Sequence, residues 1–127
     1  RSPMNAVISV WFYKHLCGLK IDPEQAGFAR FLIEPVFPKK LDAAQCWLDT
    51  VKGKVAVGWK REAGKITLNI TVPYNSTAVA RFRERAAVLT TDFTGRTIAE
   101  QEVLDQTDRK TRWMYTLPAG NHLLQLG

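Results

Sequence analysis

The sequence predicts a mainly β fold, an antiparallel β-sandwich of jelly-roll-like type preceded by one N-terminal α-helix. After residue 27, apolar residues recur at alternate positions in short runs. Such runs, separated by turn signals at intervals of about 8–12 residues, are typical of sandwiches and small barrels. Helical stretches do not alternate with these runs, which argues against a parallel, doubly wound sheet. A chain of 127 residues, 46% of them hydrophobic, is sufficient for one such domain.

The predicted helix spans Met4–Leu19. Pro3 suits a first helical turn, and Gly18 suits a C-terminal stop. Apolar residues cover nearly the whole circumference of this helix, and a helix of that kind is buried on all sides in its native setting. We therefore expect it to derive from a larger helical body. In isolation it should lie across the β domain or form a homodimer through residues 4–19, because a large apolar surface is rarely left bare.

The β domain is predicted to span residues 21–127. Its strands are expected around Phe31–Ile33 and at Leu41–Asp49, Lys54–Arg61, Lys65–Val72, Ala78–Arg83, Ala86–Thr91, Arg112–Leu117 and His122–Leu126, with a short strand near Ile98 or Val103. Ala63-Gly64 predicts a tight hairpin between the third and fourth of these strands.

Cysteines and histidines are few, and we interpret them as structural. Two cysteines, Cys17 and Cys46, cannot form a disulfide framework or a four-thiolate zinc site. We expect both to be buried small apolar residues, with a disulfide or a reactive thiol as the alternatives. His15 is expected at a helix end, and His122 is expected to be solvated in a turn. No spacing suits a metal, and no cofactor is expected.

Two segments, Trp11–Leu19 and Ala26–Pro35, carry a family resemblance. The first is similar to the last helix of the (α/α)6 catalytic barrel of the bacterial α-L-rhamnosidases of glycoside hydrolase family 78. The second resembles the strand that begins the C-terminal β-sandwich of that family. The turn at Lys52-Gly53, the stretch Trp59–Leu68 and Pro118-Ala119-Gly120 continue the resemblance.

The resemblance implies that residues 1–20 are the end of a catalytic barrel and that the barrel is the partner of the β domain. In that family the two carboxylates of the inverting hydrolysis of α-L-rhamnosides come from the barrel, so a structural role and no catalytic residue are expected here. Glu34, Asp42 and Asp49 are interpreted as solvated strand carboxylates. The family's Asn-His pair before the helix falls on Arg1-Ser2 and is not retained.

Trp47 carries the alternative hypothesis, a carbohydrate-binding module. Its position in the alternation places it with the polar residues Gln45 and Asp49, opposite Ala44, Cys46 and Leu48. An exposed indole can stack on the C–H groups of a sugar ring, so these three polar-face residues are the candidate site for rhamnose-containing glycans. Burial against the N-terminal helix is the favoured interpretation of Trp47.

A net charge of +6 raises a weaker alternative, a nucleic-acid-binding β domain. Arg81, Arg83 and Arg85 alternate on one predicted strand face, and a second basic cluster lies at residues 109–112. Neither cluster contains an aromatic stacking platform, so a solvated face is favoured. No run of about 18 apolar residues predicts a membrane span. No leader peptide is recognised before Met4, and the resemblance leaves the bacterial compartment open.

Overall fold

The computed structural model describes residues 17–22, 29–92 and 98–127. The predicted helix, as far as residue 16, lies outside these residues, as do His15 and the proposed dimer contact of that helix. The described ranges form β1 (Leu19–Asp22), β2 (Ala29–Ile33), β3 (Ala43–Thr50), β4 (Gly53–Glu62), β5 (Lys65–Val72), β6 (Ser76–Phe82), β7 (Ala86–Thr91), β8 (Ala99–Leu104), β9 (Thr111–Leu117) and β10 (Gly120–Leu126).

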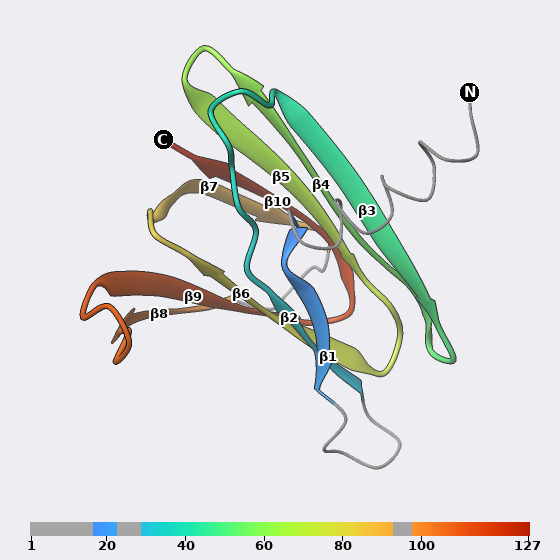
Figure 1. The fold of residues 1–127 in the computed structure, drawn as a ribbon. Helices are drawn as coiled ribbons and strands as arrows, with labels where there is room; N and C mark the ends of the chain where they lie inside the picture. The colour runs from blue at the N-terminus through green and yellow to red at the C-terminus, as the bar shows by residue number, and fades with distance from the viewer. Residues whose placement is uncertain (1–16, 23–28, 93–97) are drawn as a thin grey trace.

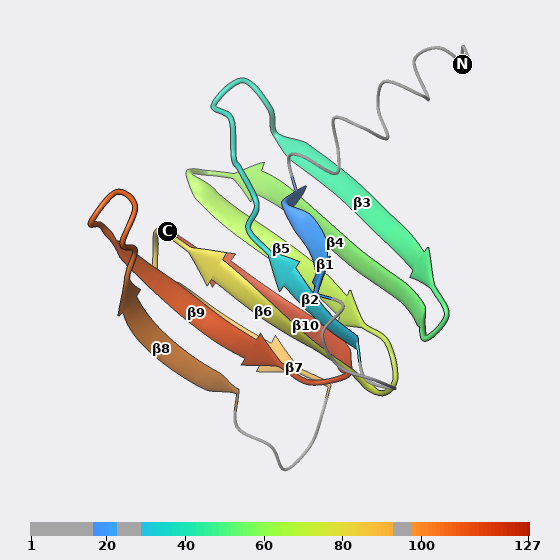
Figure 2. The same ribbon diagram turned by 60° about the horizontal axis from the view of Figure 1, so that its bottom comes forward.

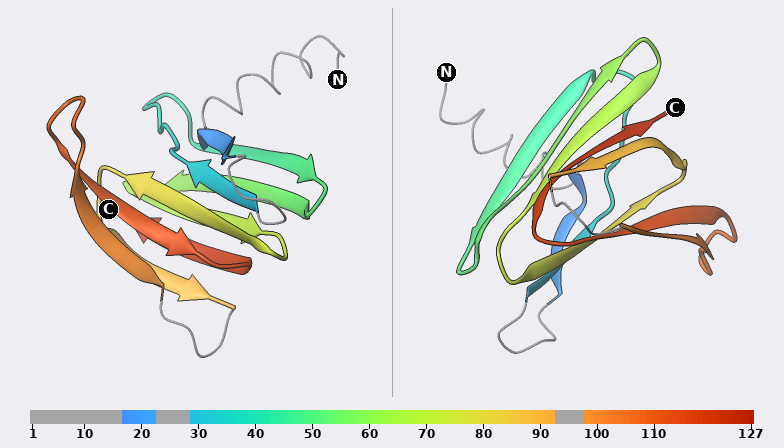
Figure 3. Two further views of the ribbon diagram at one scale, coloured as in Figure 1. Left: turned by 90° about the horizontal axis from the view of Figure 1, so that it is seen from below. Right: turned by 180° about the vertical axis from the view of Figure 1, so that it is seen from behind.

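The strands form two five-stranded sheets. Sheet I has the order β1-β2-β6-β9-β8, and sheet II has the order β3-β4-β5-β10-β7. Figure 1 shows the ribbon, and Figure 2 looks onto sheet I with strands of sheet II behind it. Strands β3 and β8 lie at opposite sides of the molecule in both views of Figure 3.

The pairing is antiparallel except between β2 and β6, which run parallel with Ala29 beside Ser76 and Ile33 beside Ala80. The expectation of a purely antiparallel fold is therefore wrong at this pair. The chain leaves sheet I after β2, builds β3, β4 and β5 of sheet II, and returns to sheet I as β6. A long excursion of this kind allows the returning strand to enter in the same direction as β2.

The two sheets share one hydrophobic core. Alternate residues of each strand enter it, as period-two patterning requires. Among the largest fully buried side chains are Tyr115 and Phe31 of sheet I and Leu68, Ile70 and Leu124 of sheet II. The inward faces of β3, β4 and β5 follow this alternation, since Cys46, Val57 and Leu68 are all buried.

The predicted strands are found with shifts of one or two residues at their ends, and Ala63-Gly64 forms the expected hairpin turn. Both turn residues have positive φ, 51° and 78°, as a two-residue turn matched to strand twist needs. One strand was not predicted. Leu19, expected to end the helix, instead begins β1, which pairs with β2 from Leu19 opposite Ile33 to Asp22 opposite Arg30.

Gly18 separates β1 from the preceding residues, and its backbone has φ +56°. A Cβ at this position would lie 1.9 Å from the carbonyl oxygen of Glu34, so a side chain cannot be accommodated without backbone movement. The carbonyl of Gly18 accepts a hydrogen bond of 3.1 Å from the Glu34 amide. Glycine is therefore required here both by conformation and by space.

Cys17 and Cys46 form a disulfide whose two cysteines are buried. The expectation that they are merely small apolar residues is therefore wrong, although their burial is confirmed. The cross-link joins the residue just before Gly18 to the middle of β3, an edge strand of sheet II. It thus ties the start of the sheet I segment to the other sheet.

Arg61 at the end of β4 holds the connection that crosses from sheet I to sheet II, the teal segment between β2 and β3 in Figure 1. Its Nη1 donates to the carbonyls of Pro38 and Leu41 at 2.9 and 2.6 Å, and its Nη2 donates to that of Phe37 at 3.0 Å. The guanidinium also lies 5.7 Å from the ring centroid of Trp59. One planar cation thus satisfies several carbonyls that the connection would otherwise leave unpaired.

We expect Arg61→Ala to lower the free energy of unfolding by about 2–3 kcal/mol, because several carbonyls lose a charged donor. Arg61→Lys should recover little of this loss, since an ammonium cannot reproduce the planar fork. Urea denaturation followed by tryptophan fluorescence measures both. Arg83→Ala, at an exposed arginine, is the matched control and should change stability by less than about 0.5 kcal/mol. Equal effects of Arg61→Ala and Arg83→Ala would contradict the proposed role.

Reduction of the Cys17–Cys46 disulfide should lower the free energy of unfolding by about 2–4 kcal/mol, because the cross-link spans 29 positions of the unfolded chain. Cys46→Ala should show a comparable loss, and dithiothreitol should then have no further effect. A thiol titration of the oxidised protein in denaturant should find no free thiol. Two titrating thiols would show that the bond is absent.

Candidate functional site

The residues predicted as a carbohydrate site lie together on the outer face of β3. Gln45, Trp47 and Asp49 alternate with the inward residues and are exposed. Trp47 is 53% exposed among the described residues, and the N-terminal helix against which it was expected to be buried lies outside them. The ammonium of Lys54 lies 5.7 Å from the centroid of its ring.

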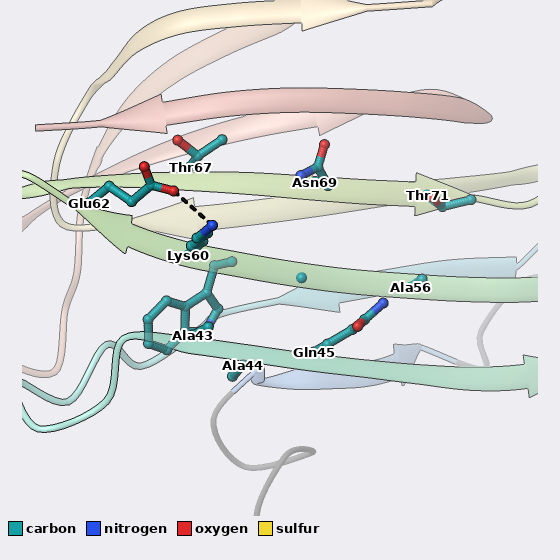
Figure 4. A pocket seen from close by; sticks show the side chains of 11 residues that line it. Ala43, Ala44, Gln45, Ala56, Lys60, Glu62, Thr67, Asn69 and Thr71 are labelled. Carbon is teal, nitrogen blue, oxygen red and sulfur yellow. Dashed lines mark ion pairs between the residues drawn. The ribbon is translucent and has the colours of Figure 1, made fainter.

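Beside these residues the outer face of sheet II is hollowed over β3, β4 and β5. This β3–β5 hollow has a volume of ≈650 Å³ and is open to solvent. It is lined by Ala43, Ala44, Gln45, Ala56, Gly58, Trp59, Lys60, Glu62, Thr67, Asn69 and Thr71. Figure 4 shows the labelled side chains with β3 and β5 on either side of β4. Trp47 is not part of the lining, but it pairs in register with Ala56, which is.

Strand register explains the depth of the hollow. Gln45 of β3 and Asn69 of β5 both pair with Gly58 of β4. The middle strand therefore has no side chain at this level, while both neighbours carry carboxamides. Sequence reasoning missed Asn69 and Gly58 as site residues. Alternation indicates which face of a strand a residue lies on, but pairing across strands is needed to bring these residues together.

The carboxylates that sequence analysis considered as a pair do not come together. Asp42 and Asp49 lie at opposite ends of β3, about 20 Å apart at the rise of an extended strand. Glu34 follows β2 of sheet I, and its carboxylate lies 3.8 Å from the Arg81 guanidinium. Glycoside hydrolysis requires two carboxyl groups within about 9.5 Å across a bound sugar. These three carboxylates do not meet that requirement as a set.

Other carboxylates have lowered pKa values, contrary to what a general acid needs. Hydrogen bonding from Arg85 lowers the pKa of Glu100, and hydrogen bonding from Arg112 lowers that of Asp108. Asn121 lowers the pKa of Asp92 through its backbone amide and its side chain. A catalytic acid must keep its proton near neutral pH, which requires a raised pKa. These groups instead remain ionised as partners of donors.

Tyr115 and Glu100 form a network at the edge where β8 and β9 approach β7. The fully buried Tyr115 donates from its hydroxyl to Glu100 Oε2 at 2.7 Å, and the hydroxyl accepts from the Ala86 amide at 2.7 Å. Arg85 donates to both carboxylate oxygens of Glu100 and lies 5.1 Å from the ring centroid of Trp113. Burial, and then the bond to Glu100, raise the pKa of Tyr115 to about 12.

Half of the basic residues that raised the nucleic-acid alternative form ion pairs, namely Arg81, Arg85 and Arg112. Strand β6 ends at Phe82, so Arg83 and Arg85 are not on one strand face with Arg81, and that expectation is wrong. Arg81 lies 3.3 Å from Asp105, and Arg112 contacts both Asp105 and Asp108.

His122 is not a solvated turn residue. It lies on β10, is 2% exposed, and faces the core with Leu124 and Leu126. Its Nε2 donates to the Pro118 carbonyl at 2.7 Å, while Nδ1 is buried without a partner among the described residues. The strand begins at Gly120, two residues before the position at which sequence analysis expected it, and alternation from there turns His122 inward.

The described part of the chain contains neither a cluster of metal-binding side chains nor a membrane-spanning helix. Within residues 17–22, 29–92 and 98–127, no group of three or more His, Cys, Asp or Glu side chains is arranged to hold a metal ion. Within the same residues, no helix is long and apolar enough to cross a membrane.

Comparison with known families gives the class of the domain. Residues 18–91 match the sequence model of the bacterial alpha-L-rhamnosidase C-terminal domain. That match spans more than half of the chain, and the chain belongs to this family.

Particular relatives agree. An alpha-L-rhamnosidase of Formosa agariphila is 29% identical over 76 residues, which are 60% of this chain and 8% of the relative. One from an Alteromonas species is 34% identical over 71 residues, or 56% of this chain and 8% of the relative. The aligned part of the chain thus covers less than a tenth of the length of these relatives.

Two solved structures share the fold. The crystal structure of Streptomyces avermitilis alpha-L-rhamnosidase complexed with L-rhamnose superposes with a TM-score of 0.60 at 19% identity, covering 92% of this chain and 10% of that one. The alpha-L-rhamnosidase from Dictyoglumus thermophilum has the same score and identity, with 91% and 13% covered. The comparisons do not favour a free-standing carbohydrate-binding module or a nucleic-acid-binding domain.

The raised pKa of Tyr115 predicts a loss of stability at high pH. Below pH 10 the phenol keeps its proton in both states, so its contribution is constant. Between pH 10 and about 12 the unfolded chain loses the proton first, and stability falls by roughly 2 kcal/mol. Tyr115→Phe should remove this fall and, at neutral pH, cost about 1–2 kcal/mol, because the Ala86 amide loses its acceptor.

Urea denaturation on both sides of pH 10 measures the pH dependence of stability in the two proteins. Tyr74→Phe, at an exposed tyrosine, is the matched control. If Tyr115→Phe loses as much stability above pH 10 as the original chain does, Tyr115 is not the cause of that loss.

Proposed function

We propose that this chain is a non-catalytic C-terminal β-sandwich domain of an α-L-rhamnosidase-like glycoside hydrolase. Its role is structural: it packs against the catalytic domain and covers that domain's last helix. The whole protein would hydrolyse terminal α-L-rhamnosides by an inverting mechanism with two carboxylates. Both carboxylates would be supplied by the catalytic domain, with the residues before Cys17 as the end of its (α/α)6 barrel.

The observation that carries the proposal is the match of residues 18–91 to the C-terminal domain family. The small share of each relative that aligns, 8% in the two Formosa and Alteromonas comparisons, supports an accessory part of a longer protein. The site geometry supports the non-catalytic role, because Glu100 and Asp108 are ionised partners of arginines rather than a free acid and base.

The apolar character of Met4–Leu19 supports the catalytic domain as partner, since a helix without a polar face needs covering on every side. A direct check is the reading frame upstream of residue 1. We expect it to encode a helical catalytic domain. A stop codon close upstream, followed by a start at Met4, would contradict the proposal.

The isolated chain should not hydrolyse p-nitrophenyl α-L-rhamnopyranoside above the rate in buffer, because arginines keep Glu100 and Asp108 ionised and neither can act as the acid. Release of p-nitrophenol measures this, with the Streptomyces avermitilis enzyme as positive control. Glu100→Gln and Asp108→Asn should leave the background rate unchanged. Enzyme-like turnover that either variant abolishes would overturn the non-catalytic assignment.

A further inference from the structure

The side chains of the β3–β5 hollow are arranged in three rows across the strands. The first row is Trp47, Ala56 and Thr71, and the second is Gln45, Gly58 and Asn69. The third contains Ala43, Lys60 and Thr67. Small residues occupy the middle strand in the first two rows, so the hollow runs along β4 between Gln45 on the β3 side and Thr67, Asn69 and Thr71 on the β5 side (Figure 4).

The width of the hollow suits a flat ring. Strands β3 and β5 are two strand spacings apart, about 10 Å, and nothing larger than a methyl group rises between them at Ala56 and Gly58. Gln45 and Asn69 flank this gap as a facing pair. A pyranose ring lying in it would have a carboxamide on each side.

The two carboxamides have unused hydrogen-bonding capacity. Neither the Gln45 nor the Asn69 side chain has a hydrogen-bond partner among the residues the structure describes. Each carboxamide offers two N–H donors and one carbonyl acceptor. The Thr71 hydroxyl donates to Asn121 Oδ1 at 2.8 Å, and its lone pairs remain as acceptors. Mixed donors and acceptors at short spacing match sugar hydroxyls, which both donate and accept.

The charge of the hollow favours a neutral ligand. Its two charged side chains, Lys60 and Glu62, form an ion pair of 3.0 Å with each other. A polyanion would require uncompensated cations, and the lining supplies none beyond this self-neutralised pair. A neutral polyol needs only hydrogen bonds and an apolar contact.

Trp47 supplies an apolar platform at the end of the hollow, because it continues the Ala56 row on β3. About half of its surface is exposed, enough for stacking against the C–H face of a second sugar ring. Lys54 lies over the ring, but a cation–π contact at an exposed site is worth only about 0.5–1 kcal/mol. Lys54 can therefore be displaced at little cost.

We propose that the β3–β5 hollow is a saccharide-binding site for a neutral pyranose oligosaccharide, with Gln45 and Asn69 as its hydrogen-bonding pair and Trp47 as its stacking platform. Asp49 of the original candidate set lies outside it, because it does not line the hollow. Binding at this face requires no hydrolytic activity. The binding experiment therefore tests the saccharide site independently of the proposed structural role.

The test is a heteronuclear NMR titration of the full chain with L-rhamnose and with an α-linked rhamnotriose. We expect the side-chain amide signals of Gln45 and Asn69 and the indole signal of Trp47 to shift and saturate, with a dissociation constant on the order of 1 mM for the trisaccharide. Asn69→Ala should weaken binding at least tenfold. Trp47→Phe should weaken the trisaccharide more than the monosaccharide.

Gly58→Val is the decisive variant because it adds a side chain to the floor of the hollow. A Cβ at Gly58 would lie 3.7 Å from Gln45 Cγ, an ordinary contact, and valine suits a strand. Binding should fall at least tenfold. Thr116→Val on sheet I is the matched control and should bind as the original chain does. Gly58→Ala, a smaller change, covers the case in which valine disturbs the fold.

Three results would overturn the proposal. One is a titration without shifts for both rhamnose probes. Another is saturable binding that Gly58→Val and Gly58→Ala leave unchanged, which would place the ligand elsewhere. The third is binding of a heparin tetrasaccharide, but of neither neutral probe, which would assign the surface to polyanions.

Discussion

Everything in this fold depends on two sheets burying one apolar face each against the other. That requirement makes alternate residues of every inner strand hydrophobic, and it forces the chain to cross between layers. A crossing segment cannot use ladder hydrogen bonds, and its carbonyls must find other donors. Arg61, at the end of β4, supplies these donors to carbonyls of the segment between β2 and β3 while its guanidinium lies against Trp59.

The same constraint explains what could be predicted from sequence. A period of two reveals which side of a strand faces the core, and the orientation of Trp47 and Val57 followed from it. It does not reveal which strands are neighbours, so the parallel β2–β6 pair and the Cys17–Cys46 bond were not predictable. Strand β1 was missed because four residues after a glycine are too few to show a period.

The candidate site divides in the same way. Gln45 and Trp47 were accessible to sequence reasoning because one strand carries both. Gly58 and Asn69 were not, since their importance arises from register between three strands. The carboxylates could not be interpreted from sequence for the same reason. Glu100 and Asp108 each form an ion pair with an arginine, which gives them a structural role. Gln45 and Asn69, which lack such partners among the described residues, are the outer-face residues proposed to bind the saccharide.

The position of the disulfide also has a mechanical consequence. Strand β1 is a four-residue edge strand, and tension applied to it directly would open its hydrogen bonds to β2 one after another, as a zipper opens. Cys17 precedes β1 and is bonded to the middle of β3. A pull arriving from the N-terminal side therefore passes through a covalent bond into an eight-residue strand of sheet II before it reaches β1. The disulfide therefore protects the β1–β2 hydrogen bonds from a force applied on the N-terminal side of the domain.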